Sequence, residues 1–72
     1  MYKNIRILKL ANPDMSMFAL KEIIGSIDTA EASNIIRRSP GVVLRGVFTP
    51  YARLIKEELE KTGALVVLEW RP

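Results

Sequence analysis

The chain has 72 residues, of which 49% are hydrophobic and 26% charged, and it carries a formal net charge of +3. This length predicts one domain over residues 1–72. So small a chain buries only about 60% of the surface of its unfolded form, which leaves little room for an enclosed substrate cavity. The absence of cysteine and histidine excludes disulfides, thiolate metal sites and a histidine general base.

Targeting and membrane-spanning patterns are also missing from the sequence. No basic N-terminal flank precedes an apolar run as in a signal peptide. No apolar run approaches the roughly 20 residues that a membrane span needs. We therefore expect a soluble, cytoplasmic domain with no membrane contact.

The first third of the chain has the pattern of a strand followed by a helix. Residues 2–10 predict a β-strand, because apolar and polar side chains alternate there. Asn12 and Pro13 mark a helix start, since asparagine caps helices and proline is tolerated in the first turn. Apolar residues at helical spacing extend this helix over residues 15–24, and Gly25 is expected to end it in the left-handed conformation.

Two further helices and two strands follow. Asp28, with Glu31 three positions later, forms a capping-box pattern and predicts a second helix that runs to Arg38. Thr49 followed by Pro50 repeats the cap-then-proline start and introduces the third helix. The second strand, the third helix and the third strand are expected over residues 42–47, 51–62 and 64–70.

The order β-α-α-β-α-β predicts an α+β fold in two layers. Short connections make neighbouring elements run antiparallel, so the second and third strands both oppose the first. A right-handed crossover through the third helix then places the first strand in the middle, in a three-stranded antiparallel sheet of order 2-1-3. All three helices are expected on one face of this sheet, which leaves the other face uncovered.

Small residues and amphipathic positions recur in the second half of the chain. They are Pro40, Gly46-Val47, Ala52, Lys56, Leu59, Glu60 and Gly63-Ala64. In this pattern the chain resembles the C-terminal domain of the bacterial ribosomal stalk protein of the large subunit. The resemblance extends over nearly the whole chain and implies a non-enzymatic protein-interaction module connected with translation. Because Met1 directly precedes the first strand, we expect this chain to lack the family's N-terminal dimerisation segment and hinge.

The resemblance also implies a partner-binding surface on the first helix, since the family recruits translational GTPases through apolar and basic side chains there. Matched by position, that surface is formed by Ser16, Met17, Leu20, Lys21 and Ile24. Phe18 joins the expected partner-binding residues because it is the aromatic side chain of this helix that we expect to be partly exposed. At least two of Met15, Met17 and Phe18 are expected to fill the core, because the helix is apolar on nearly all sides.

The adaptor of the Clp protease shares the stalk fold and offers an alternative resemblance. Asn12, Asp14 and Ser16, together with Gly46-Val47-Phe48-Thr49, match part of its pattern. The adaptor's pocket uses a histidine, which this chain lacks. The missing histidine argues against recognition of the first residue of degradation substrates, so a Clp-adaptor-like peptide-binding protein is kept as an alternative only.

The outer face of the predicted sheet is expected to be apolar. If Ile5, Ile7, Val66 and Leu68 point at the helices, their neighbours point away, because side chains alternate along a strand. The outward residues are then Arg6, Leu8, Leu65 and Val67, with Leu44 joining them if Val43 is inward. Large aliphatic side chains on an uncovered face predict self-association, most simply a homodimer. The alternative is a strand register shifted by one residue, which would exchange the two faces.

Four arginines suggest a small nucleic-acid-binding regulator as the competing function. Arg37, Arg38, Arg45 and Arg53 could together contact phosphates. Against this, cations in the last turn of a helix interact with its dipole, and Arg53 has Glu57 four residues on. The aromatic residues are not interleaved with these arginines along the sequence, as single-strand binders require.

Nothing in the sequence predicts an enzyme, a metal or a cofactor. The glutamates of the third helix, Glu57, Glu58 and Glu60, lie on its solvated face and balance Lys56 and Lys61. No phosphate-binding loop, nucleophile elbow or cluster of metal ligands is present. We therefore expect a binding protein with an unidentified protein partner.

Overall fold

The computed structural model of the chain describes residues 1–71. Its elements, in chain order, are β1 (Tyr2–Lys9), α1 (Pro13–Ile23), α2 (Thr29–Ile36), β2 (Gly41–Phe48), α3 (Thr49–Glu60) and β3 (Leu65–Trp70). Every predicted strand and helix is present, and no boundary differs from the predicted one by more than two residues.

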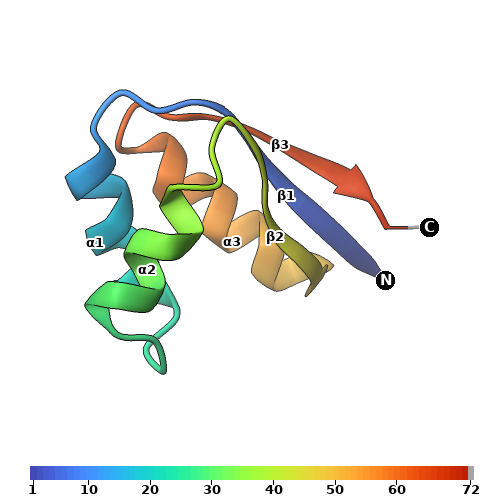
Figure 1. The fold of residues 1–72 in the computed structure, drawn as a ribbon. Helices are drawn as coiled ribbons and strands as arrows, with labels where there is room; N and C mark the ends of the chain where they lie inside the picture. The colour runs from blue at the N-terminus through green and yellow to red at the C-terminus, as the bar shows by residue number, and fades with distance from the viewer. Residues whose placement is uncertain (72) are drawn as a thin grey trace.

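The three strands form one antiparallel sheet, and the helices cover one of its faces. The strand order is β2-β1-β3, and β1 pairs antiparallel with both neighbours. Figure 1 shows α1, α2 and α3 on the same side of the sheet, and the strand ends that carry the two termini extend past the helical layer. The predicted two-layer α+β fold is confirmed.

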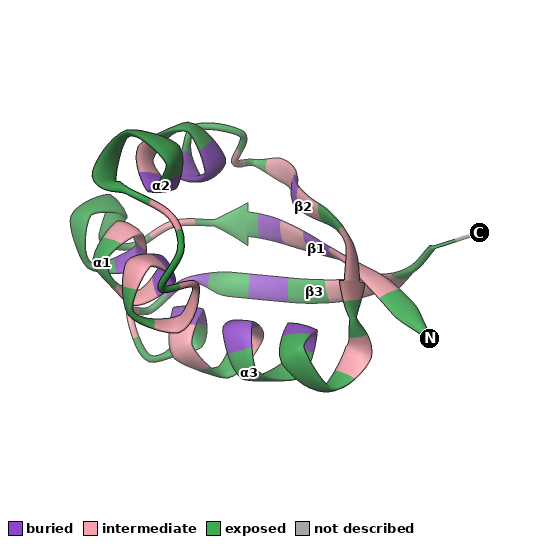
Figure 2. Ribbon diagram, turned by 90° about the horizontal axis from the view of Figure 1, so that it is seen from below, coloured by how far each residue is buried: buried purple, intermediate pink, exposed green. Residues whose placement is uncertain are grey.

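One hydrophobic core lies between the sheet and the helices. Its fully buried side chains come from β1, all three helices and β2, and they are Ile5, Ile7, Leu20, Ala32, Val43, Ala52, Ile55 and Leu59. Figure 2 shows the buried positions of α3 on the side that faces the strands. The inward direction of Ile5, Ile7 and Val66 confirms the predicted strand register.

The starts of α1 and α2 follow their predicted capping signals. The Asn12 side chain accepts a hydrogen bond from the backbone N–H of Met15 at 3.1 Å, and Pro13 is in the first turn of α1. Asp28 and Glu31 form a complete capping box, in which the Glu31 N–H donates to Asp28 at 2.8 Å and the Asp28 N–H donates to Glu31 at 3.1 Å. These bonds satisfy backbone donors that have no partner within the helix.

The structure contradicts two predicted helix boundaries, the end of α1 and the start of α3. Gly25 lies outside the left-handed region, and α1 ends instead with the N–H of Ile24 donating to the carbonyl of Leu20. Thr49 does not cap α3 because β2 runs directly into that helix, so Thr49 is already its first residue. Its hydroxyl donates to the carbonyl of Met1 at 3.1 Å.

An irregular β2 overturns the predicted position of Leu44. Leu44 pairs with Ile5, whereas the next residue of β1, Arg6, pairs with Val42, so Val43 is one extra residue on β2. Such a bulge places two consecutive side chains toward the same face. Val43 is buried and Leu44 packs against the core, so Leu44 faces the helices and not the outer face of the sheet.

Candidate functional site

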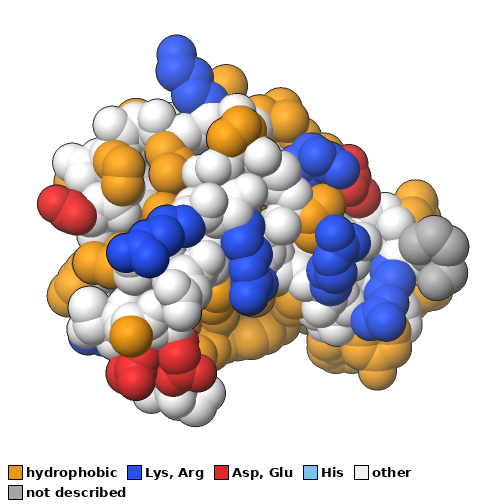
Figure 3. Space-filling model, in the orientation of Figure 1, with side chains coloured by type: hydrophobic (Ala, Val, Ile, Leu, Met, Phe, Trp, Pro, Cys, Tyr) orange, Lys and Arg blue, Asp and Glu red, His pale blue; other side chains and the backbone are white. Residues whose placement is uncertain are grey.

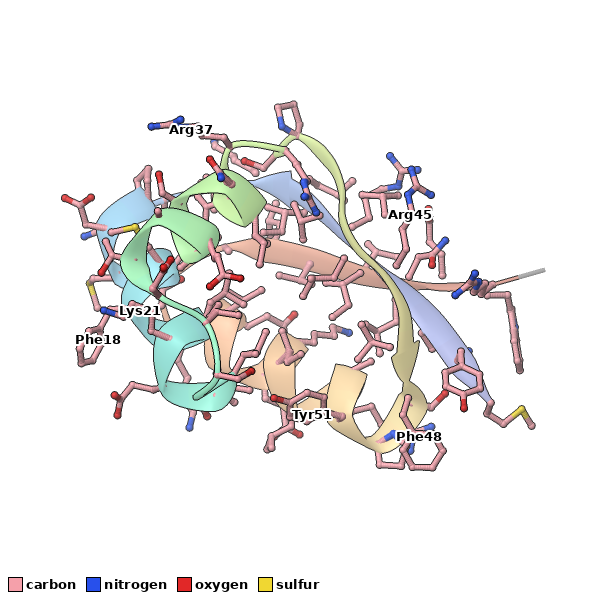
Figure 4. All side chains as sticks on the ribbon, turned by 60° about the horizontal axis from the view of Figure 1, so that its bottom comes forward. Phe18, Lys21, Arg37, Arg45, Phe48 and Tyr51 are labelled. Carbon is pink, nitrogen blue, oxygen red and sulfur yellow. The ribbon has the colours of Figure 1, made fainter. Side chains whose placement is uncertain are left out.

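The exposed apolar surface of α1 consists of Met15 and Phe18. Phe18 is 64% exposed, as predicted, and Figure 4 shows its ring pointing away from the body of the molecule. Met15 is 52% exposed, so the prediction that at least two of Met15, Met17 and Phe18 fill the core is wrong. Met17 alone of these three packs against the core.

The other predicted partner-binding residues of α1 are partly or wholly covered. Leu20 is 1% exposed and lies in the core, and Ser16 is fully buried, so neither belongs to a binding surface. Ile24 is half-buried against the core. Lys21 is half-buried, and its ammonium donates to the Thr29 hydroxyl at 2.8 Å, which ties α1 to the start of α2.

A groove of about 490 Å³ runs between α1 and the C-terminal end of α3, and we call it the α1–α3 groove. Its lining residues are Asp14, Met15, Phe18, Ala19, Glu22, Glu58, Lys61 and Thr62. The apolar part of the lining comes from α1. Sequence reasoning placed a surface on α1 alone and missed the contribution of α3, because the pattern of one helix does not show which helix packs beside it.

The charges around the α1–α3 groove are mainly negative. Asp14, Glu22 and Glu58 contribute carboxylates, and Lys61 is the single basic residue in the lining. The Lys61 ammonium donates to the Glu58 carboxylate at 2.7 Å, and this hydrogen bond raises the pKa of Lys61. Since the Lys61–Glu58 pair carries no net charge, the carboxylates of Asp14 and Glu22 give the groove its negative charge.

The outer face of the sheet carries exposed apolar side chains and one ion pair. Leu8, Leu65 and Val67 are exposed, as predicted. Arg6 donates to Glu69 on the neighbouring strand at 2.7 Å, and this hydrogen bond raises the pKa of Arg6. Leu44 is absent from this face because of the bulge. Val42 takes its place, because it pairs with the outward-facing Arg6.

The four arginines of the nucleic-acid alternative do not converge on one site. Arg37 and Arg45 lie apart and point outward in Figure 4. Arg38 donates to the carbonyl of Val43 at 2.9 Å and so joins the end of α2 to β2. Arg53 lies on α3, and among residues 1–71 the ion pairs are Arg6–Glu69 and Lys61–Glu58, so the expected Arg53–Glu57 pair does not form.

A second hollow, of about 370 Å³, lies where β1, β3 and the start of α3 meet, and we call it the aromatic hollow. It is lined by Met1, Lys3, Phe48, Thr49, Pro50, Arg53 and Trp70. The Lys3 ammonium lies 3.5 Å from the centre of the Trp70 ring, and the rings of Tyr2 and Phe48 are 6.0 Å apart. These residues are distant in sequence and meet because β1 pairs Tyr2 with Phe48 and Lys3 with Trp70.

Cations gather on one face of the molecule. Figure 3 shows Lys and Arg side chains in a row across this face, from the helical layer toward the strand ends near the termini. Hydrophobic side chains lie beneath the cations at that end. This face of the molecule therefore presents a row of positive charge.

Residues 1–71 contain neither a metal-binding cluster nor a membrane-spanning helix. Within that range, no three or more acidic side chains come close enough to hold a metal ion. No helix in the described part of the chain has the length and apolar character needed to cross a membrane.

A scan against protein-family models gave no match, and searches of curated proteins and of solved structures gave none. The resemblance to the ribosomal stalk domain therefore stays a prediction.

Proposed function

We propose that this chain is a non-enzymatic protein-interaction module that binds a segment of a partner protein in the α1–α3 groove. The observation that carries the proposal is the exposure of Met15 and Phe18 side by side with a groove formed by two helices. A large aromatic side chain in water is costly, and burial against a partner is its usual use at interfaces. Methionine adds a pliable surface that adapts to the shape of a ligand.

The composition of the groove favours one kind of ligand. Its volume is in the range of sites that enclose a few side chains. Asp14 and Glu22 at its edge attract cations and repel acidic segments. The ligand that fits is a peptide segment with an apolar anchor residue flanked by lysine or arginine.

The resemblance to the stalk domain supports a more specific version of the proposal. On that resemblance alone, we propose that the partner acts in translation and that the protein works in the cytoplasm. The buried position of Leu20 changes the expected contact residues, because the accessible apolar side chains of α1 are Met15 and Phe18 rather than the full set predicted for this helix.

A peptide selection tests the proposal. A random peptide library is displayed on phage and selected against the native chain, and the enriched peptides are titrated by fluorescence anisotropy against native protein, Phe18→Ser and Leu54→Ser. Leu54 is a matched control, because it is an exposed leucine on α3 outside the groove. We expect peptides with an apolar anchor and basic flanks, roughly ten-fold weaker binding to Phe18→Ser, and unchanged binding to Leu54→Ser.

Two results would overturn the proposal. One is the failure of any peptide family to be enriched above background. The other is enrichment of peptides that bind native protein and Phe18→Ser equally well, since the groove would then not be their site.

A homodimer through the outer sheet face is a second proposal about partners. It is supported by the exposed Leu8, Leu65 and Val67, which lie at one end of the sheet with no element over them. The α1–α3 groove lies on the helical layer, so self-association through the sheet would leave it accessible.

A further inference from the structure

We infer that the aromatic hollow is a binding site for a single strand of nucleic acid. In this site, unpaired bases stack on Phe48 and on the face of Trp70 that Lys3 does not cover, and Arg53 and Lys3 contact the phosphates. The inference is independent of the peptide site, because the aromatic hollow is at the N-terminal end of α3 and the α1–α3 groove is at its C-terminal end.

The first support is the gathering of exposed aromatic rings. Of the five aromatic residues in the chain, three lie at this end of the sheet: Tyr2, Phe48 and Trp70. Trp70 is 67% exposed and Phe48 is 55% exposed. Rings that stand in water on a rigid strand end provide flat surfaces on which bases of any sequence can stack.

The second support is the sign of the charge. Among the side chains that line the aromatic hollow, Lys3 and Arg53 are the charged ones, and both are cationic. Glu69 is near this end of β3, but its carboxylate accepts a hydrogen bond from Arg6 on the outer face. The hollow thus combines a positive potential with aromatic surface, which is the pair of features that single-strand binders use.

Further cations extend this potential along β2. Arg45 is exposed on β2, and the guanidinium of Arg71 lies against Gly46, where a side chain on residue 46 would otherwise sit. The row of Lys and Arg side chains in Figure 3 leads toward the same end of the molecule. The phosphates of a nucleic acid bound in the aromatic hollow can therefore contact further cations outside it.

The aromatic rings decide between nucleic acid and an acidic protein segment. A carboxylate-rich peptide would use the cations but has no need of Trp70 and Phe48. Duplex DNA or RNA would also leave these rings unused, because its bases are already stacked on one another. An unpaired strand uses both the rings and the cations, so it is the occupant that the hollow fits.

Trp70 is the only tryptophan in the chain, so its fluorescence reports on this site alone. We would titrate native protein with unlabelled oligo(dT) and oligo(U) of about ten nucleotides at about 50 mM salt and follow tryptophan quenching. We expect saturable quenching by both strands and loss of affinity as the salt concentration rises. Comparison of the oligo(dT) and oligo(U) affinities shows whether the site distinguishes deoxyribose from ribose. A duplex of the same length is the control for strand pairing.

Variants separate this site from general attraction between a basic protein and a polyanion. Phe48→Leu and Arg53→Gln are each expected to weaken binding roughly ten-fold. Arg37→Gln removes the same charge from the other end of the molecule and should change the affinity by less than about two-fold. Circular dichroism of each variant verifies that it is folded.

Three outcomes would overturn the inference. Arg37→Gln and Arg53→Gln could weaken binding equally, which would mean that only net charge matters. The duplex or an acidic peptide such as polyglutamate could quench Trp70 as strongly as the single strands. Finally, the single strands could leave the fluorescence of Trp70 unchanged. Peptide binding in the α1–α3 groove is measured with different variants, so failure of one proposal is distinguishable from failure of the other.

Discussion

At the scale of single residues, Ser16, a fully buried polar side chain, shows how α1 is joined to the end of α3. The Ser16 hydroxyl lies 2.8 Å from the Thr62 hydroxyl, and Thr62 donates its hydrogen to the carbonyl of Leu59 at 2.6 Å. Because a hydroxyl has one hydrogen, Ser16 must be the donor to Thr62. This chain of bonds holds together the two elements that form the α1–α3 groove.

Thr62→Val should destabilise the fold more than Ser16→Ala does. The valine leaves the buried Ser16 hydroxyl without a partner, which costs about 2 kcal/mol, whereas the alanine leaves Thr62 bonded to Leu59 and costs about 1 kcal/mol. In the double variant, the free energy of unfolding in urea should fall by less than the two single losses combined. Additivity within about 0.5 kcal/mol would contradict the proposed bond.

Gly63→Ala is the second residue-scale prediction. Gly63 has a φ of +87°, and a Cβ there would lie 2.8 Å from the Cβ of Ala11. The left-handed conformation costs an alanine about 1 kcal/mol or more, and the contact adds to it. Gly25→Ala is the matched control, because Gly25 is outside the left-handed region and nothing lies near its added Cβ. Equal thermal stability of the two variants would show that the turn after α3 is not as described.

At the scale of elements, the starts of α1 and α2 were predictable from the sequence, whereas the start of α3 and the path of β2 were not. The capping of α1 and α2 depends on residues within one turn, so Asn12 and Asp28 identify it. The bulge that turns Leu44 inward depends on how β1 and β2 pair, which no local pattern shows. In the same way, apolar residues on nearly all sides of α1 gave no means of telling that Met15 faces water and Leu20 faces the core.

The short helix α2 should depend on its capping box. It has eight residues, and so short a helix is marginal without its caps and its packing. Asp28→Ala removes the acceptor for the Glu31 N–H and should lower the free energy of unfolding by about 1 kcal/mol. Glu31→Gln keeps an acceptor for the Asp28 N–H and should change the free energy by less than about 0.5 kcal/mol. Urea unfolding compares the two, and equal losses would mean that the Asp28 cap is not the important bond.

At the scale of the whole molecule, the fold followed from the order of the elements, but the hollows did not. Short connections and alternation along the strands were sufficient for the order β2-β1-β3. The aromatic hollow requires Trp70, Phe48 and Lys3 to meet at the end of the sheet. These residues are separated along the chain, so only the strand register brings the aromatic rings and the cations together.

The proposed homodimer makes a prediction at this scale. Sedimentation across a concentration series should give a dimer for the native chain and a folded monomer for Leu65→Lys combined with Val67→Glu, which adds charge to the outer face without changing the net charge. Leu54→Lys places a charge on an exposed position of α3 and should leave the dimer intact. A native chain that stays monomeric at every concentration would rule the dimer out.

The most direct test of the central proposal is to map where a selected peptide binds. Amide NMR spectra of the native chain, recorded with and without the peptide, report each residue separately. If the α1–α3 groove is the site, the largest changes in amide chemical shift will fall on residues 14–22 of α1 and on residues 58–62, which span the end of α3 and the turn that follows. Largest shifts on the outer face of the sheet or around the aromatic hollow would contradict the proposed function.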